Sequence, residues 1–157
     1  MTVKRMAWVM IAASAALASA CGTPNPLVGR WTSTQMFPPA GAGQPGEMGT
    51  IVVTADFGAD NSYSATLMGN GGCSGSLQLS GYKITLTPST ATSGSFSVST
   101  LGTCSGGPIM CSFGGRMVPL ASCDSATGNP MGMPSQYVLS SDGRTATIGG
   151  GMYTRVN

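Results

Sequence analysis

The stretch TIVVTADFGADNSYSATL, residues 50–67, decides the fold that the sequence predicts. Apolar and polar side chains alternate on both sides of Asp60 and Asn61, which are typical turn residues. Such alternation, with a turn between the two runs, indicates a pair of antiparallel strands that each have one buried and one solvated face. The positions expected to face inward here are Ile51, Val53, Ala55, Tyr63, Ala65 and Leu67.

The same period of two continues in both directions, and turn signals at 69–72, Ser80-Gly81 and Asp142-Gly143 separate the runs. The expected strands are residues 29–34, 50–55, 62–67, 73–79, 82–87, 95–100, 136–139, 144–148 and 152–156. We therefore predict an all-β fold, an antiparallel up-and-down meander of eight or nine strands. A closed barrel is favoured because it leaves no exposed sheet edges.

Residues 102–134 interrupt this rhythm with three of the cysteines and several Gly and Pro breakers. We expect one strand at 112–118 and otherwise long loops held by disulfides.

The N-terminus has the three parts of a secretory signal. Lys4 and Arg5 are positive, residues 6–17 are apolar or small, and 18–20 are small residues suited to cleavage. The apolar run is too short for a transmembrane helix, which needs roughly 20 residues. The sequence thus predicts a signal helix and an exported protein.

With Cys21 directly after Ala20, this segment resembles a bacterial lipoprotein signal. The resemblance implies lipidation of Cys21, an anchor in the membrane and, from Gly22, sorting to the outer membrane. Ala18 stands where that family prefers Leu, and an ordinary secretory signal cut after Ala20 is the alternative. The expected organisation is a signal at 1–20, the lipidated cysteine and a short tether at 21–28, and a barrel domain at 29–157.

Lipidation of Cys21 would explain the odd number of five cysteines. Four others remain for two disulfides: Cys73, Cys104, Cys111 and Cys123. Three pairings are open, and we favour Cys73–Cys104 with Cys111–Cys123. A zinc site is the alternative, although the C-x-x-C spacing typical of such sites is absent.

Composition excludes several classes of function. Only 8% of the residues are charged, and the net charge of +2 falls to zero when Lys4 and Arg5 leave with the signal. This leaves no row of basic groups for nucleic-acid phosphates. The sequence has no histidine, which excludes Ser-His-Asp and Cys-His catalysis and imidazole-based metal sites.

Gly29-Arg30-Trp31 on the first strand and Arg155 on the last resemble the signature of calycins, the group that includes lipocalins. The resemblance implies a lipocalin-like barrel in which Trp31 closes one end and Arg155 stacks on its ring as a cation–π pair. It also implies a small apolar ligand. A second lipocalin motif around T-D-Y is absent. The inward residues that could line a pocket, or simply fill the core, are Tyr63, Leu77, Tyr82, Phe96 and Tyr137.

Other chemistry has weaker support. Four methionines, at 110, 117, 131 and 133, could offer thioethers to Cu(I). Asp56 and Asp60 do not follow an EF-hand spacing. We therefore predict a non-enzymatic, lipid-anchored envelope protein without a metal or cofactor, which binds a small apolar ligand. The alternative is a structural or protein-interaction module with a filled barrel core.

Overall fold

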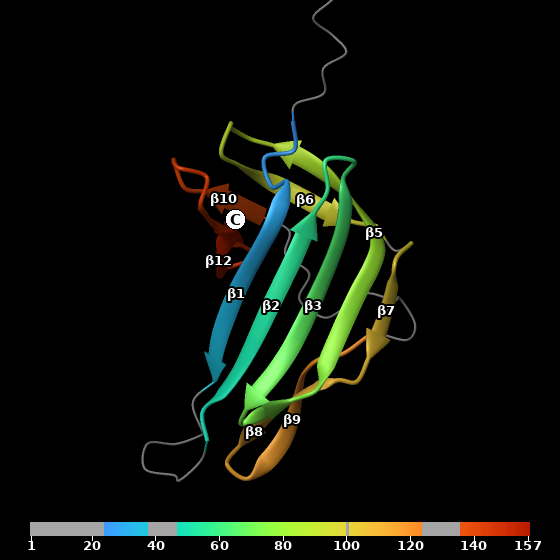
Figure 1. The fold of residues 1–157 in the computed structure, drawn as a ribbon, viewed down its shortest axis with the longest axis vertical. Helices are drawn as coiled ribbons and strands as arrows, with labels where there is room; N and C mark the ends of the chain where they lie inside the picture. Colours follow the sequence, from blue (N-terminus) through green and yellow to red (C-terminus); the bar gives the residue numbers. More distant parts are fainter. Residues whose placement is uncertain (1–23, 38–46, 100, 124–135) are drawn as a thin grey trace, which may run out of the picture.

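The computed structural model describes residues 24–37, 47–99, 101–123 and 136–157. These residues form strands and turns without a helix (Figure 1). The strands are β1 (Gly29–Phe37), β2 (Gly49–Phe57), β3 (Ser62–Gly71), β4 (Cys73–Ser74), β5 (Ser76–Pro88), β6 (Ser93–Val98), β7 (Thr103–Gly106), β8 (Ile109–Phe113), β9 (Arg116–Ala121), β10 (Gln136–Leu139), β11 (Thr145–Ile148) and β12 (Gly151–Val156).

Eight of these strands close into an antiparallel barrel, which confirms the predicted fold class. Their order around the barrel is β1, β2, β3, β5, β6, β10, β11 and β12, and β12 pairs back with β1. The order follows the chain, so the barrel is an up-and-down meander with two insertions. One insertion is β4, and the other runs from β7 to β9, where β7 adds an extra edge to β5.

The barrel core consists of the alternating apolar residues that the sequence indicates. Along β2 every second residue from Gly49 to Phe57 is buried, and β3 pairs with β2 without a break from Gly71 to Tyr63. Trp31, Tyr82 and Tyr137 are among the largest fully buried side chains. The period of two therefore sets both the register of the sheet and the composition of its interior.

The turn expected at Ser80-Gly81 is wrong, because β5 runs through both residues as one strand of 13 residues. The register against β3 shifts here, so that Ala65 lies opposite Leu79 while Tyr63 lies opposite Tyr82. Gly81, with φ +72°, takes up the extra residue in a left-handed conformation. This bulge lets the strand change the parity of its inward positions without turning back.

The turn expected at 69–72 begins later than its glycines suggest. Strand β3 continues to Gly71, which lies opposite Gly49 on β2. A Cβ atom at Gly69 would lie only 2.8 Å from the backbone nitrogen of Ser74. Gly69 therefore allows β4 to approach the sheet closely, while Gly71, with φ +63°, and the turn residue Gly72 direct the chain into β4.

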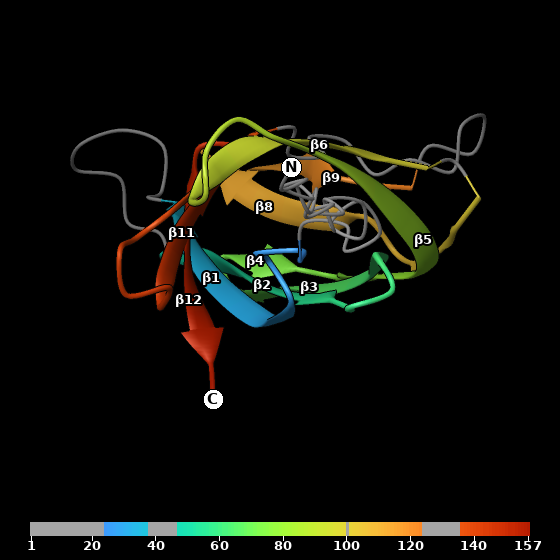
Figure 2. The same ribbon diagram turned by 90° about the horizontal axis from the view of Figure 1, so that it is seen from above.

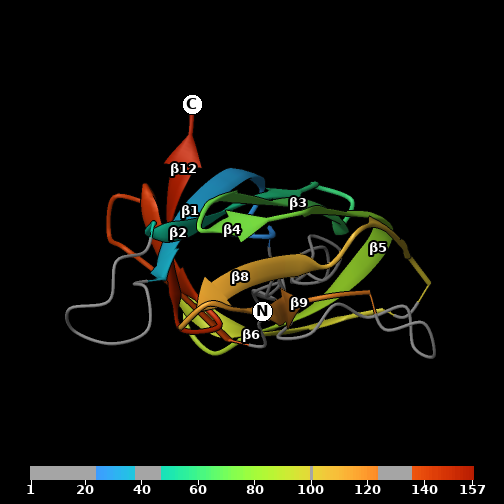
Figure 3. The same ribbon diagram turned by 90° about the horizontal axis from the view of Figure 1, so that it is seen from below.

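A separate three-stranded sheet, β4–β8–β9, covers one end of the barrel, and we call it the cap (Figure 3). The single strand expected at 112–118 is wrong: Gly114 and Gly115 turn the chain between β8 and β9. The cap is attached by a hydrogen bond from Ser112 N to Gly72 O (2.8 Å) and by the edge-to-face contact of Phe37 with Phe113 (6.3 Å).

The four cysteines form two disulfides, as predicted, but the favoured pairing is wrong. The pairs are Cys73–Cys111 and Cys104–Cys123. Cys73 and Cys111 lie directly opposite each other on β4 and β8, because β8 folds back onto the strand that follows β3. The first disulfide thus cross-links two strands of the cap, β4 and β8, and the second joins β7 to the residues after β9.

Some predictions concern residues outside the described part of the chain. The signal at 1–20, Cys21 and the stretch 124–134 belong to this group. Where the chain is described, it has no helix with the length and apolar character to cross a membrane.

Candidate functional site

The short segment at 24–28, which we call the strap, lies at the barrel end opposite the cap, beside the β2–β3 and β5–β6 turns (Figure 1). Leu27 is completely buried, and its carbonyl oxygen accepts a hydrogen bond from Trp31 Nε1 (2.7 Å). The carbonyl of Pro26 accepts another from Arg155 Nη2 (3.2 Å). The strap is therefore fixed to the barrel by its backbone as well as by an apolar side chain.

The stacking that the calycin resemblance implies is present in the structure. The Arg155 guanidinium carbon lies 4.6 Å from the centroid of the Trp31 ring, across the β1–β12 pair. Trp31 has no exposed surface. Within the described residues, Arg155 Nε has no hydrogen-bond partner. The indole thus fills the barrel below the strap, with a cation on its face.

A cavity of about 530 Å³ lies beside the strap. Ile84 and Tyr137 are its buried residues, while Thr85, Thr90 and Ala91 are exposed, so the cavity reaches solvent. The lining residues are Pro24, Pro26, Asn61, Ile84, Thr85, Leu86, Pro88, Thr90, Ala91 and Tyr137. Its volume is within the usual range for small-molecule sites, and none of these residues is charged.

Tyr137 is the lining residue that has a buried polar atom without a partner among the described residues. The residue is 1% exposed, and its hydroxyl has no hydrogen-bond partner among the described residues. Burial raises the pKa of this phenol, so it stays protonated and able to donate at neutral pH. A buried hydroxyl without a partner has a desolvation cost that a bound acceptor would offset.

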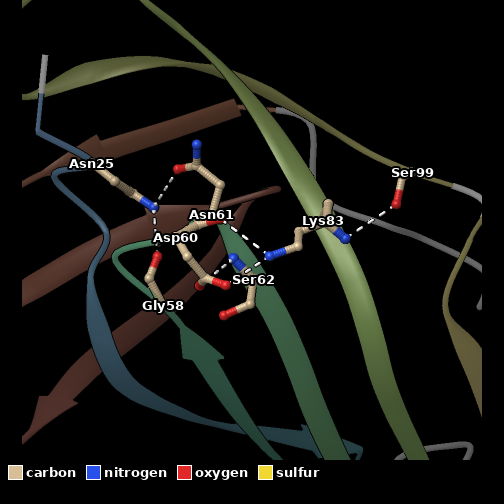
Figure 4. Close-up of polar contacts among 7 residues, drawn as sticks. All are labelled: Asn25, Gly58, Asp60, Asn61, Ser62, Lys83 and Ser99. Atoms are coloured by element: carbon tan, nitrogen blue, oxygen red, sulfur yellow. Dashed lines mark hydrogen bonds and ion pairs between the residues drawn. The ribbon is translucent and has the colours of Figure 1, made fainter. Parts of the chain in front are cut away.

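The rim of the cavity carries a polar cluster on the β2–β3 turn (Figure 4). Asn25 Nδ2 donates to Gly58 O (3.4 Å) and Asn61 Oδ1 (3.3 Å), which fastens the strap to this turn. Lys83 Nζ lies 2.7 Å from Asp60 Oδ2. The hydrogen bond from Lys83 is the main reason that the pKa of Asp60 falls below its usual range. The charges at the rim are therefore paired.

Among the five residues proposed from the sequence as pocket residues, Tyr137 lines this cavity and the other four lie elsewhere in the buried core. Phe57 contacts Tyr63 (5.1 Å between ring centroids) and Phe96 (6.0 Å), and Phe96 lies 6.4 Å from Tyr137. Leu77 and Tyr82 are buried as well. Burial raises the pKa of Tyr63, consistent with its apolar surroundings.

Pro24 and Pro26 are not predictable as site residues from the sequence, because prolines before a first strand are typical of a simple spacer. The available signal was Leu27-Val28, an apolar pair that a solvated spacer does not need. Ile84 and Leu86 share the inward face of Tyr82 by alternation along the predicted strand 82–87, although nothing in the alternation separates a cavity wall from the core.

The structure describes only two of the four methionines considered for Cu(I) binding, and these two lie on neighbouring strands, with Met117 opposite Ser112. Met110 and Met117 lie on β8 and β9 of the cap, and positions 131 and 133 lie outside the described residues. Asp56 pairs with Arg30 (2.8 Å) on the barrel surface. In the described ranges, no three His, Cys, Asp or Glu side chains are placed to hold a metal ion.

Comparison with protein-family models, with curated proteins and with solved structures gives no match for this chain.

Proposed function

We propose that this chain is an exported, lipid-anchored protein that binds a small, neutral, largely apolar ligand in the cavity beside the strap. The observation that carries the proposal is the uncharged cavity of about 530 Å³ at this barrel end, whose lining includes Tyr137 with its buried hydroxyl that has no partner among the described residues. We assign it a binding role rather than a catalytic one.

The chemistry of the lining defines the class of ligand. Proline, isoleucine and leucine side chains favour an apolar body, because burial of apolar surface contributes about 25 cal/mol per Å². The Tyr137 hydroxyl favours one oxygen atom that accepts a hydrogen bond. A charged ligand is disfavoured, because the lining residues carry no opposite charge to offset its desolvation.

The localisation proposed here is the bacterial cell envelope, with acylated Cys21 as the anchor. Its support is the sequence alone: an apolar run, small residues and then a cysteine. A mass spectrum of the protein extracted from membranes tests it. The expected mass is that of a chain beginning at acylated Cys21, and a chain that retains residues 1–20 would contradict the anchor.

Binding is tested with N-phenyl-1-naphthylamine, a neutral apolar dye whose fluorescence rises in apolar surroundings. The wild-type protein should bind it with saturation, and Ala91→Trp should abolish binding by filling the cavity from its exposed rim. Ser141→Trp is the matched control, because Ser141 is an exposed turn residue that does not line the cavity. Equal binding by all three proteins, or none by the wild type, would contradict the proposal and favour the interaction-module alternative.

A further inference from the structure

We infer that the cavity faces the membrane that holds the protein and takes its ligand, an apolar molecule with one oxygen, directly from the bilayer. This inference rests on the proposed function, both for the anchor at Cys21 and for the ligand site. It adds the source of the ligand and the orientation of the barrel.

The first argument is the short chain distance between the anchor and the cavity. Pro24 lines the cavity and lies three residues after Cys21. Three residues reach at most about 11 Å, since an extended chain spans about 3.3–3.6 Å per residue. An acylated cysteine lies at the membrane surface, so the cavity rim must remain within about this distance of the lipid head groups.

The second argument is that the strap is fastened to the barrel and does not act as a free linker. Leu27 is fully buried, Asn25 bonds to the β2–β3 turn, and Pro26 accepts a hydrogen bond from Arg155 on β12. Three different parts of the barrel end therefore hold these residues. Because the strap cannot extend without breaking these contacts, it cannot carry the cavity away from the membrane.

The third argument is the asymmetry of the two barrel ends. The cap lies at the barrel end away from the strap (Figures 1 and 3), and the cavity is at the strap end, where Pro24 and Pro26 line it. Strand β3 has 10 residues, or about 33 Å at 3.3 Å per residue. With the strap at the bilayer, the cap is therefore directed away from it.

The distribution of charged residues around the cavity is compatible with a ligand that enters it from a membrane. The ion pair of Asp60 with Lys83 neutralises the rim, and the lining residues have no charged side chain. A neutral amphiphile can then pass from the bilayer to the cavity without placing a charge in an apolar site.

The test uses acylated protein in vesicles of phosphatidylethanolamine and phosphatidylglycerol that contain some head-group nitroxide lipid. A bimane label is attached at Ala91→Cys on the cavity rim, or at Met117→Cys on the exposed surface of β9 in the cap. We expect the nitroxide to quench the label at position 91 and to leave the label at position 117 unquenched. Equal quenching at both positions would overturn the inference.

A second variant tests the source of the ligand. About twenty Gly/Ser residues inserted after Gly22 give a flexible linker of roughly 25 Å, which frees the barrel from the surface. Dye dissolved in the bilayer should reach this variant more slowly than the wild type, whereas dye added in solution to detergent-extracted protein should bind both equally. Equal rates of transfer from the bilayer would contradict membrane loading. Loss of dye binding in every format would instead contradict the proposed function.

Discussion

Tyr137 is the residue at which folding and the proposed function conflict. Its ring packs near Phe96 in the core, yet its hydroxyl is buried without a partner among the described residues. Such a group lowers the stability of the unliganded fold, because it loses its bonds to water on folding. A hydroxyl kept at this position is explained if a ligand supplies the acceptor.

Replacing Tyr137 by Phe should therefore change stability and binding in opposite directions. The free energy of unfolding without ligand should rise by about 1 kcal/mol, because an unsatisfied hydroxyl is removed. The dissociation constant for a ligand with an acceptor oxygen should rise about two- to tenfold, the worth of one neutral hydrogen bond. Denaturant unfolding and dye displacement by that ligand measure the two effects.

Tyr153→Phe is the control, since Tyr153 does not line the cavity. It should leave the dissociation constant unchanged. A Tyr137→Phe protein that is less stable and binds with unchanged affinity would show that the hydroxyl has a structural partner instead.

Trp31 and Arg155 show how far single residues can be predicted from sequence. Their stacking was expected from three residues near the first strand and one on the last. This contact could be predicted because an up-and-down meander closes into a barrel when its first strand pairs with its last. The hydrogen bond from Trp31 to Leu27 was not predicted, although Asn25-Pro26 is a turn signal and Asn25 Oδ1 accepts a hydrogen bond from Leu27 N (2.9 Å).

Among the elements, β5 departs most from the expected pattern, and one glycine accounts for it. Gly81→Ala should lower the free energy of unfolding by about 1–2 kcal/mol, because an L side chain is disfavoured at φ +72°. A Cβ there meets no atom within 4 Å, so the cost comes from the backbone alone. Chemical denaturation measures it.

Gly107→Ala is the matched control for this change. Its Cβ also meets no atom within 4 Å, and its φ lies outside the left-handed region. This variant should be unchanged or more stable by up to about 1 kcal/mol. If both alanine variants behave alike, Gly81 is not the residue that forms the bulge.

The cap depends on its disulfides to a predictable degree. Loss of Cys73–Cys111, through the double alanine variant, should cost about 4 kcal/mol, and loss of Cys104–Cys123 about 3 kcal/mol. The difference follows from sequence separations of 38 and 19 residues. Denaturant unfolding of the two double variants measures both costs, and an undiminished stability after loss of the first pair would contradict its role in holding β4 to β8.

The alternation of apolar and polar residues predicted the barrel strands but could not predict the cap. Alternation reports which faces are buried, and in a barrel that is sufficient to order neighbouring strands. The cap lies across the barrel end, where burial comes from contacts such as Phe37 with Phe113 between distant segments. For the same reason the cysteine pairing followed from the placement of β8 against β4 rather than from spacing along the chain.

The stability of the whole molecule should be almost constant between about pH 5 and 9, because the sequence has no histidine. Burial raises the folded-state pKa of Tyr63, Tyr82, Tyr137 and Tyr153 above the usual value of 10.0. Their contribution is fully present below pH 10 and is lost as the pH rises further. Thermal unfolding across the alkaline range measures this, and Tyr63→Phe should reduce the loss.

At acid pH, the dependence of the stability on pH has the opposite sign, so the stability falls as the pH falls. The hydrogen bond from Lys83 lowers the pKa of Asp60, and the hydrogen bond from Ser140 lowers that of Asp142, both from 3.8. Their stabilising contributions are present above about pH 4 and are lost as the pH falls through the lowered values. A clear change in melting temperature between pH 6 and 8 would contradict this distribution of titrating groups.

At the scale of the molecule, the cap covers one end of the barrel, and Figure 2 views the barrel from the other end, where the strap lies. Trp31 and the cavity lie at the strap end. The barrel itself was predictable from alternation, because closure follows from the number and order of the strands. The cavity was not, because it depends on where the strap residues Pro24 and Pro26 pack.

The most direct test of the central claim is a methyl NMR titration with the neutral dye. We predict that the methyl resonances of Ile84 and Leu86, on the cavity wall, shift with saturation, whereas those of Leu77 and Ile109 in the core remain unchanged. Shifts confined to Leu77 and Ile109, or the absence of any shift, would contradict a ligand site at this end of the barrel.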